Sequence, residues 1–185
     1  ISFTGAAIQF PEPVHASVTA GKKRSGSWSV TMTGAPGRAA SICQNIKLNR
    51  SSDTTFLLSG WSMGTSVPDL ETEVSGKTDE SSLRYWGITL TFTYADGTTE
   101  HHDLPFCDYV RGWQYADRSV VPKKSGTIIT AASIKLRYQN NANTVWFDDI
   151  SLTEEPAQTY RYDDKGNLIS VKSQGNGEEG YQYNG

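Results

Sequence analysis

The sequence predicts an all-β protein, an antiparallel β-sandwich of the jelly-roll type with a β-hairpin appended at its C-terminal end. Short segments in which apolar and polar residues alternate recur along the chain, and turn-forming residues separate them about every dozen positions. No segment shows the helical period of about 3.6 residues. With 185 residues, 36% of them hydrophobic, the chain can bury one core and carry an appendage.

The N-terminal half of the sandwich rests on predicted strands at residues 28–33, 41–46 and 54–61, which mix β-branched, aromatic and small residues. In the first of them, Trp28, Val30 and Met32 alternate with serine and threonine. We therefore expect these three side chains in the core, together with Trp113 and Trp146 from later strands.

The clearest predicted strand runs from residue 86 to residue 94. Ile88, Leu90 and Phe92 fall on one face and the intervening threonines on the other, which indicates a sheet with one buried and one solvated face. The pair Asp96-Gly97 then predicts a tight turn into a strand over residues 99–104. Further strands are expected at residues 112–120, 133–139 and 144–152.

The appended hairpin is predicted from residues 159–171, where two strand-like runs flank a cluster of turn residues. A two-stranded hairpin is only marginally stable alone. We therefore expect residues 1–153 to form the sandwich, 154–158 a linker, and 159–185 the start of a further domain whose remaining strands lie beyond this sequence. The alternative is a tyrosine-rich tail.

The turn of this hairpin carries a resemblance to a known family. The spelling Tyr160-x-Tyr162-Asp163-x-x-Gly166-Asn167-Leu168 resembles the YD (Rhs) repeat of large bacterial surface and secreted proteins. Residues 181–185 would open a second copy. The resemblance implies a wall-associated or secreted bacterial protein, extracellular or at the cell surface, with the rest of the repeat protein as a partner of the sandwich.

Charge and composition exclude several classes of partner. A net charge of −3 with only short cationic stretches leaves no broad basic field, so nucleic acid is not expected as a partner. No apolar run approaches the roughly 20 residues needed to cross a bilayer, so no membrane insertion is expected in this fragment. The start lacks a signal-peptide pattern, so any export signal is expected upstream. Whether Cys43 and Cys107 pair stays open.

The order of segments in residues 20–153 resembles the jelly-roll carbohydrate-binding modules of the CenC-like type. The matching segments are residues 25–34, 43–48, 56–61, 112–115 and 145–152. The resemblance implies a sandwich that binds a polysaccharide or glycan, and it predicts the fold better than the ligand.

Such modules carry one structural calcium, and the resemblance implies that Asp148 and the backbone near Ser25 would hold it. By strict alternation Asp148 points to the core side with Trp146 and Ile150, and an inward carboxylate needs a partner or a cation. The N-terminal acid of the family pattern is missing, since Phe3 is followed by Thr4. The alternative is that Asp148 accepts backbone N–H bonds or meets Arg or Lys.

A sugar site would combine an aromatic platform with polar side chains. Trp61 lies opposite Phe56 in the alternation and is the best candidate for an exposed tryptophan, while Arg137 and Gln139 fall on the solvated side of their strand. Tyr85, just before the clearest strand, is a further candidate. We expect Trp61, Arg137 and Gln139 to share one open face if sugar is bound; otherwise these aromatics pack between strands.

Catalysis is not expected. His101 and His102 are neighbours on a predicted strand and so point to opposite faces, and no carboxylate pair of the glycosidase kind is placed in a cleft. The sequence therefore favours a non-catalytic glycan-binding module. The second hypothesis is a structural or adhesive spacer that contacts protein partners or the repeats without binding sugar.

Overall fold

The computed structural model describes residues 15–35, 37–65, 84–108, 110–155, 158–163, 168–173 and 178–180. Every regular element among them is a β-strand, which confirms the predicted fold class. In chain order the strands are β1 (Ala16–Thr19), β2 (Ser29–Thr33), β3 (Ala39–Ser51), β4 (Thr55–Gly64), β5 (Tyr85–Tyr94), β6 (Thr99–Pro105), β7 (Gln114–Val120), β8 (Ile128–Gln139), β9 (Thr144–Glu155), β10 (Gln158–Tyr162), β11 (Leu168–Ser173) and β12 (Glu178–Gly180). The described residues contain no helix that could span a membrane.

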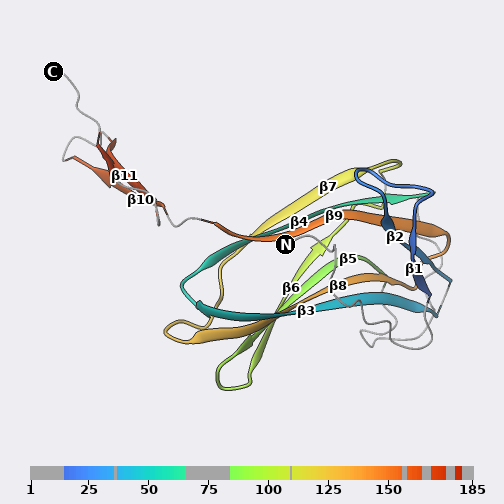
Figure 1. The fold of residues 1–185 in the computed structure, drawn as a ribbon, viewed down its shortest axis with the longest axis horizontal. Coiled ribbons are helices and arrows are strands. Elements are labelled where there is room, and N and C mark those ends of the chain that lie inside the picture. The colour runs from blue at the N-terminus through green and yellow to red at the C-terminus, as the bar shows by residue number, and fades with distance from the viewer. Residues whose placement is uncertain are drawn as a thin grey trace.

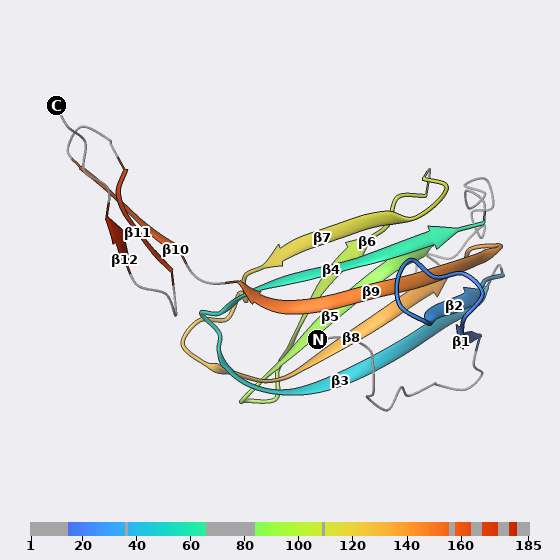
Figure 2. The same cartoon turned by 45° about the horizontal axis from the view of Figure 1, so that its top comes forward.

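Strands β1 to β9 form a sandwich of two antiparallel sheets (Figures 1 and 2). One sheet has five strands in the order β1-β2-β9-β4-β7, and the other has four in the order β3-β8-β5-β6. Strands that are neighbours in a sheet are mostly distant in sequence, as β2 beside β9 and β3 beside β8. This is the two-sheet arrangement that the sequence predicted.

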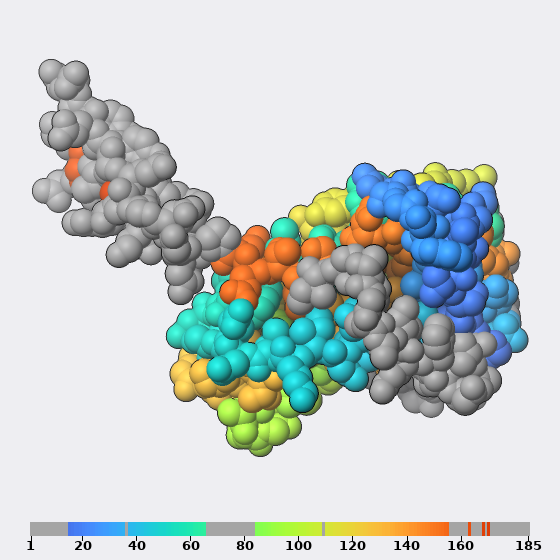
Figure 3. Space-filling view, in the orientation of Figure 1, coloured from blue at the N-terminus to red at the C-terminus, as the bar shows by residue number. Residues whose placement is uncertain are grey.

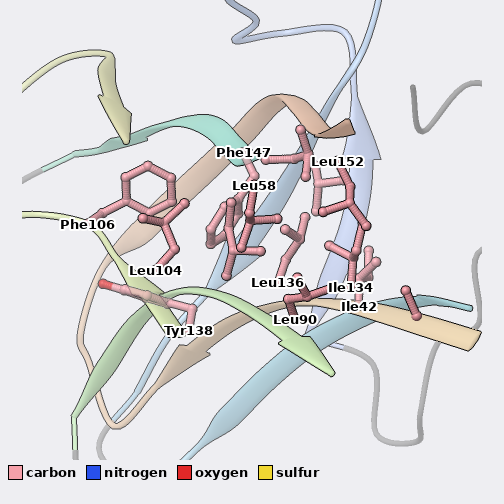
Figure 4. Packing of buried hydrophobic residues seen from close by; sticks show 14 of the residues in the cluster. Ile42, Leu58, Leu90, Leu104, Phe106, Ile134, Leu136, Tyr138, Phe147 and Leu152 are labelled. Carbon is pink, nitrogen blue, oxygen red and sulfur yellow. The ribbon is translucent and has the colours of Figure 1, made fainter. Parts of the chain in front are cut away.

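The core lies between the two sheets and is made by the inward residues of both (Figure 4). Leu58, Ile88, Leu90 and Leu136 have no measurable exposure, and the Phe56 and Phe92 rings meet across the interface with centroids 5.0 Å apart. Each such side chain contributes about 2 kcal/mol through burial. The alternation predicted for residues 86–94 is confirmed, because Ile88, Leu90 and Phe92 are buried beneath the solvated face of their sheet.

Strand β9 breaks the strict alternation on which one prediction depended. Its pairing with β4 is irregular between Ser59 and Trp61, and Asp149 has a φ of 49°, so one extra residue is accommodated there. Val145 and Phe147 are buried before the irregularity, whereas Ile150 and Leu152 are buried after it. The predictions that Trp146 lies in the core and that Asp148 points to the core side are therefore wrong. Both side chains are half-buried on the outer face.

Trp28 is the second correction, because its side chain is 61% exposed. Strand β2 begins at Ser29, so Trp28 lies in the preceding loop, where the side-chain alternation of a strand does not apply. Trp113 likewise precedes β7 and is half-buried. The thiols of Cys43 and Cys107 are both free.

The predicted C-terminal hairpin is present as β10 and β11, and β12 adds a third strand that the sequence did not indicate. This small sheet lies apart from the sandwich in both ribbon views. Glu154 and Glu155 pair with β4 as part of β9, so the predicted linker is shorter than expected at its start. The suggested second copy at residues 181–185 and the acid-rich N-terminal segment lie outside the described residues.

Candidate functional site

The outer face of the four-stranded sheet carries a continuous set of polar side chains, which we call the polar face. The strand register places their Cα atoms in rows across the sheet. From β3 to β6 the face consists of Ser41, Cys43, Asn45 and Lys47; Ser133, Lys135, Arg137 and Gln139; Tyr85, Thr89 and Thr91; and His101 and Asp103.

Arg137 is the centre of a hydrogen-bonded group on this face. Its guanidinium donates to Thr89 Oγ1 at 3.2 Å and to Gln139 Oε1 at 3.0 Å, and its Nη1 atom lies 3.9 Å from Asp103 Oδ1. The side chain is 28% exposed. Because two of five N–H groups are used and the rest of the fork is held in place, Arg137 can donate to an incoming ligand without first losing conformational freedom.

Tyr85 supplies the aromatic surface of the group. The guanidinium carbon of Arg137 lies 4.4 Å from the ring centroid, within cation–π range. The Tyr85 hydroxyl donates to Ile88 O at 3.0 Å and to Asp103 Oδ1 at 3.2 Å. Burial, followed by the nearby Asp103 carboxylate, raises the pKa of Tyr85 well above its usual range, so the group stays a hydroxyl donor at every physiological pH.

A glycine makes room for this arrangement. A Cβ atom at Gly87 would lie 2.7 Å from the Tyr85 hydroxyl and 2.6 Å from Leu104 O. The absence of a side chain there lets the phenol run along β5 as far as Asp103, on β6. Gly87 thus shapes the polar face although it contributes no polar group.

The structure brings together three of the four predicted ligand-binding residues. Tyr85, Arg137 and Gln139 are in contact or one bond apart on the polar face. Trp61 faces outward as predicted, but from the five-stranded sheet. The expectation that Trp61 shares one open face with Arg137 and Gln139 is wrong, because β4 and β8 belong to different sheets.

Trp61 is also covered. The Arg24 guanidinium lies 3.8 Å from its ring centroid and the Tyr115 ring 5.3 Å away. Residues 20–28, which we call the strap, cross the outer face of β9 here, and Figure 3 shows the blue N-terminal region against the orange β9. In this arrangement Trp61 is a packing residue beneath the strap.

Asp148 and Asp149 hold the strap. Asp148 Oδ2 accepts from the backbone N–H groups of Arg24 at 2.7 Å and Ser25 at 3.2 Å, and Oδ1 accepts from the Asp149 N–H at 2.8 Å. Arg24 Nη1 donates to Asp149 Oδ2 at 2.8 Å, and Ser25 Oγ donates to Asp149 Oδ1 at 2.5 Å. This matches the alternative in which Asp148 accepts backbone N–H bonds.

The described surroundings of Asp148 do not fit calcium. A cation needs oxygen ligands that point at it, whereas the groups pointing at this carboxylate are N–H donors, with a guanidinium beside them. No group of three or more His, Cys, Asp or Glu suited to a metal occurs among the described residues. Calcium at Asp148 and Ser25 stays a prediction from the family resemblance alone.

A second polar group, not anticipated from the sequence, lies inside the β5–β6 end of the sandwich. Glu100 accepts from the Tyr94 hydroxyl and from the Lys123 N–H at 3.0 Å, and its Oε1 lies 2.5 Å from His102 Nε2. His102 is buried and His101 exposed, as the alternation predicted. A shallow pocket lined by Tyr94, Glu100 and His101 opens beside this group.

Asp103 and Thr89 were the other site residues that sequence reasoning did not single out as a pair. A signal was available, because counting outward from the Asp96-Gly97 turn pairs Thr89 with Asp103. Thr89 Oγ1 donates to Asp103 Oδ1 at 2.6 Å.

Comparison with known sequences gives a short and partial match. No family model matches the chain. The tRNA nuclease WapA of Bacillus subtilis (strain 168) is 32% identical over 104 residues, which is 52% of this chain and 4% of that protein. The tRNA3(Ser)-specific nuclease WapA of Bacillus spizizenii matches to the same extent. Because the chain spans so little of these relatives, their nuclease activity is not carried over to it.

Comparison with solved structures shows the fold. Family 16 Carbohydrate Binding Module-2 superposes with a TM-score of 0.54 at 16% identity, covering 77% of this chain and 88% of that one. The CBM22-1 and GH10 modules of Clostridium thermocellum endo-1,4-β-D-xylanase 10B, complexed with xylohexaose, give a TM-score of 0.55 at 10% identity, covering 83% and 27%.

An arabinose-bound α-L-arabinofuranosidase also matches, with a TM-score of 0.54 at 12% identity, covering 82% of this chain and 24% of that one. Since all these identities are low, the matches show the fold alone. Residues 15–155 thus form a jelly-roll sandwich of the kind found in carbohydrate-binding modules.

Proposed function

We propose that the sandwich is a non-catalytic module that binds polysaccharide through its polar face, within a secreted or surface-located bacterial protein. The observation that carries the proposal is the Arg137 group, in which a fixed guanidinium, a carboxylate, a hydroxyl and an aromatic ring meet on a solvated sheet. Donors and acceptors side by side match the vicinal hydroxyls of a sugar, and an aromatic ring matches its C–H face.

The carboxylates support binding over hydrolysis. A glycosidase of the common kind needs two carboxyl groups on either side of the bond that it breaks. Of the polar-face residues given above, Asp103 is the single carboxylate, and it is already engaged with Thr89 and Tyr85. The fold match to carbohydrate-binding modules points the same way.

The wider context is part of the proposal. The three-stranded sheet of β10 to β12, apart from the sandwich, agrees with a YD (Rhs) repeat region that begins after β9. In this view the module tethers a repeat protein to a glycan, with the repeats as its partner in the chain.

The alternative function is a structural spacer that binds no sugar. One observation favours it, since the Arg137 guanidinium already lies against the Tyr85 ring and could leave that ring too little open surface for a pyranose. A ligand would then have to displace Arg137 or bind beside it.

A screen of the protein against soluble polysaccharides, wild type beside Tyr85→Ala and Trp61→Ala, separates the two functions. The proposal predicts saturable binding that Tyr85→Ala weakens at least about tenfold, the scale of one lost stacking contact with its hydrogen bond. Trp61→Ala is expected to retain binding. A folded protein that binds none of the polysaccharides would support the spacer.

A further inference from the structure

The charges of the polar face differ in sign from those of the whole chain. The chain carries a net charge of −3. The polar face carries three cations, Lys47, Lys135 and Arg137, against one carboxylate, Asp103. A local excess of positive charge on an acidic protein selects for anionic partners at this surface.

The two lysines are not neutralised within the fold. Lys47 and Lys135 are both exposed, and among the described residues neither has an acidic group within 4.0 Å of its ammonium. By contrast, Lys124 pairs with Asp96 and Arg24 with Asp149 elsewhere on the surface. The unpaired charge of the polar face is therefore available to a ligand.

The lysines and Arg137 are placed to act together. Lys135 and Arg137 are two residues apart on β8 and so project from the same face about 7 Å apart. Lys47, on the neighbouring strand β3, pairs in register with Ala131. The cations thus follow the sheet over a distance comparable with two sugar units, and Ser41, Asn45 and Ser133 beside them add uncharged hydrogen-bonding groups.

Arg137 supplies the specific contact. A guanidinium held by Thr89 and Gln139 presents its remaining N–H groups in a planar fork, which matches the two oxygens of a carboxylate or phosphate. The Asp103 carboxylate, 3.9 Å from Nη1, is too far to use that fork as a bidentate partner.

From these observations we infer that the polar face binds an anionic polysaccharide, one whose repeating units carry carboxylate or phosphate groups. The inference rests on the proposed function and narrows its ligand class. Arg137 pairs with the anionic group of one unit, Lys135 and Lys47 attract neighbouring units, and Tyr85 contacts the sugar ring.

The test compares polymers that differ in charge and little else. Binding of the wild-type protein is measured to polygalacturonic acid, to the same polymer after methyl esterification, to a poly(glycerol phosphate) teichoic acid, and to neutral xylan. The expected result is binding to the free acid or the phosphate polymer at least about tenfold tighter than to the ester and xylan, weakened as salt rises from about 50 to about 300 mM. The two anionic polymers show which group is preferred.

Two pairs of variants locate the effect. Lys135→Gln and Lys47→Gln should each weaken anionic binding by about threefold to tenfold, as expected for a charge at the edge of a site. Lys23→Gln, which removes the same charge from the strap on the other sheet, is the matched control and should leave binding unchanged.

The outcomes are distinct. Equal, salt-independent binding to the acid, its ester and xylan would overturn the anionic assignment and leave the glycan-binding function standing. Anionic binding lost in Lys23→Gln and kept in Lys135→Gln would also overturn it, since the site would then lie on the other sheet. Binding to no polymer by the folded protein would remove both proposals.

Discussion

At the scale of single residues, His102 and Glu100 form a buried pair whose protonation differs from that of free side chains. Their side chains are 6% and 9% exposed. Burial lowers the pKa of His102 below its ordinary value, although the Glu100 carboxylate acts in the opposite direction. Burial raises the pKa of Glu100, but bonds from Tyr94 and Lys123 together with His102 outweigh it and leave that pKa lowered. The native state thus favours neutral His102 and ionised Glu100.

We predict that acidification destabilises the sandwich. A group with a lowered pKa binds fewer protons folded than unfolded, so its contribution is present above the unfolded pKa and lost as pH falls through the folded one. For His102 that loss begins below about pH 6.5 and for Glu100 below about pH 4.5. Melting temperatures measured from pH 8 to pH 4 should fall in this range, and less steeply between pH 6.5 and 5 in His102→Gln. A His102→Gln curve parallel to the wild type would contradict the account.

The Asp148–Asp149 pair gives a second prediction. Asp148→Ala leaves two backbone N–H groups of the strap without their acceptor, at a cost of about 1 kcal/mol, or roughly 3 °C in melting temperature. Asp149→Gly should be close to neutral, because glycine relieves the positive φ while only an exposed ion pair is lost. Thermal melts of both variants check this, and an equal loss in the two would contradict it.

The same melts test the metal. Since N–H groups already satisfy Asp148, adding EDTA is expected to leave the melting temperature unchanged. A fall of several degrees, restored by calcium, would mean that a cation is bound and that the strap rearranges around it.

Single-residue predictions succeeded where alternation was regular. Arg137 and Gln139 on β8 were assigned to the solvated side, and both lie on the polar face. The assignment failed at Trp146 and Asp148, because the irregular residue in β9 exchanges the two faces of the strand. Nothing in the local sequence announces that irregularity, since Asp148-Asp149 reads as ordinary strand end.

At the scale of elements, the loops after β2 and β8 meet at a glycine. A Cβ atom at Gly34 would lie 2.1 Å from Asn141 O and 2.5 Å from the Tyr138 ring. The Gly34 N–H also donates to Asn143 O at 2.8 Å. This close approach of two backbones fixes how the ends of the two sheets are joined.

Gly34→Ala is therefore expected to cost more than about 2 kcal/mol, because a backbone oxygen must move. Gly21→Ala is the matched control, since its Cβ would meet only Thr19 Oγ1 at 3.4 Å. Chemical denaturation of the two variants measures the difference. Equal stability would show that the loops separate easily.

Strand positions were predictable, whereas the sheet to which each strand belongs was not. The Asp96-Gly97 turn fixes the β5–β6 register because the pairing is local. The pairing of β4 with β9 and of β3 with β8 depends on residues about 90 positions apart, which no local pattern encodes. For that reason Trp61 and Arg137 were expected on one face and lie on two.

At the scale of the whole molecule, the sandwich and the small C-terminal sheet are separate bodies of structure joined near residues 156–157. We predict that limited proteolysis cleaves after β9 and leaves a fragment ending near residue 155 with an unchanged melting temperature. Mass spectrometry of the digest identifies the cut. Loss of the sandwich on trimming would show that the small sheet stabilises it.

The central claim is that the polar face, and not the Trp61 side, binds polysaccharide. The most direct measurement is a titration of the best-binding polysaccharide from the screen into Arg137→Ala and Trp61→Ala, each shown to be folded. Our account predicts at least about a tenfold loss of affinity in Arg137→Ala, which removes a charge-assisted contact, and wild-type affinity in Trp61→Ala. Undiminished binding by Arg137→Ala together with loss in Trp61→Ala would place the site under the strap and contradict the account.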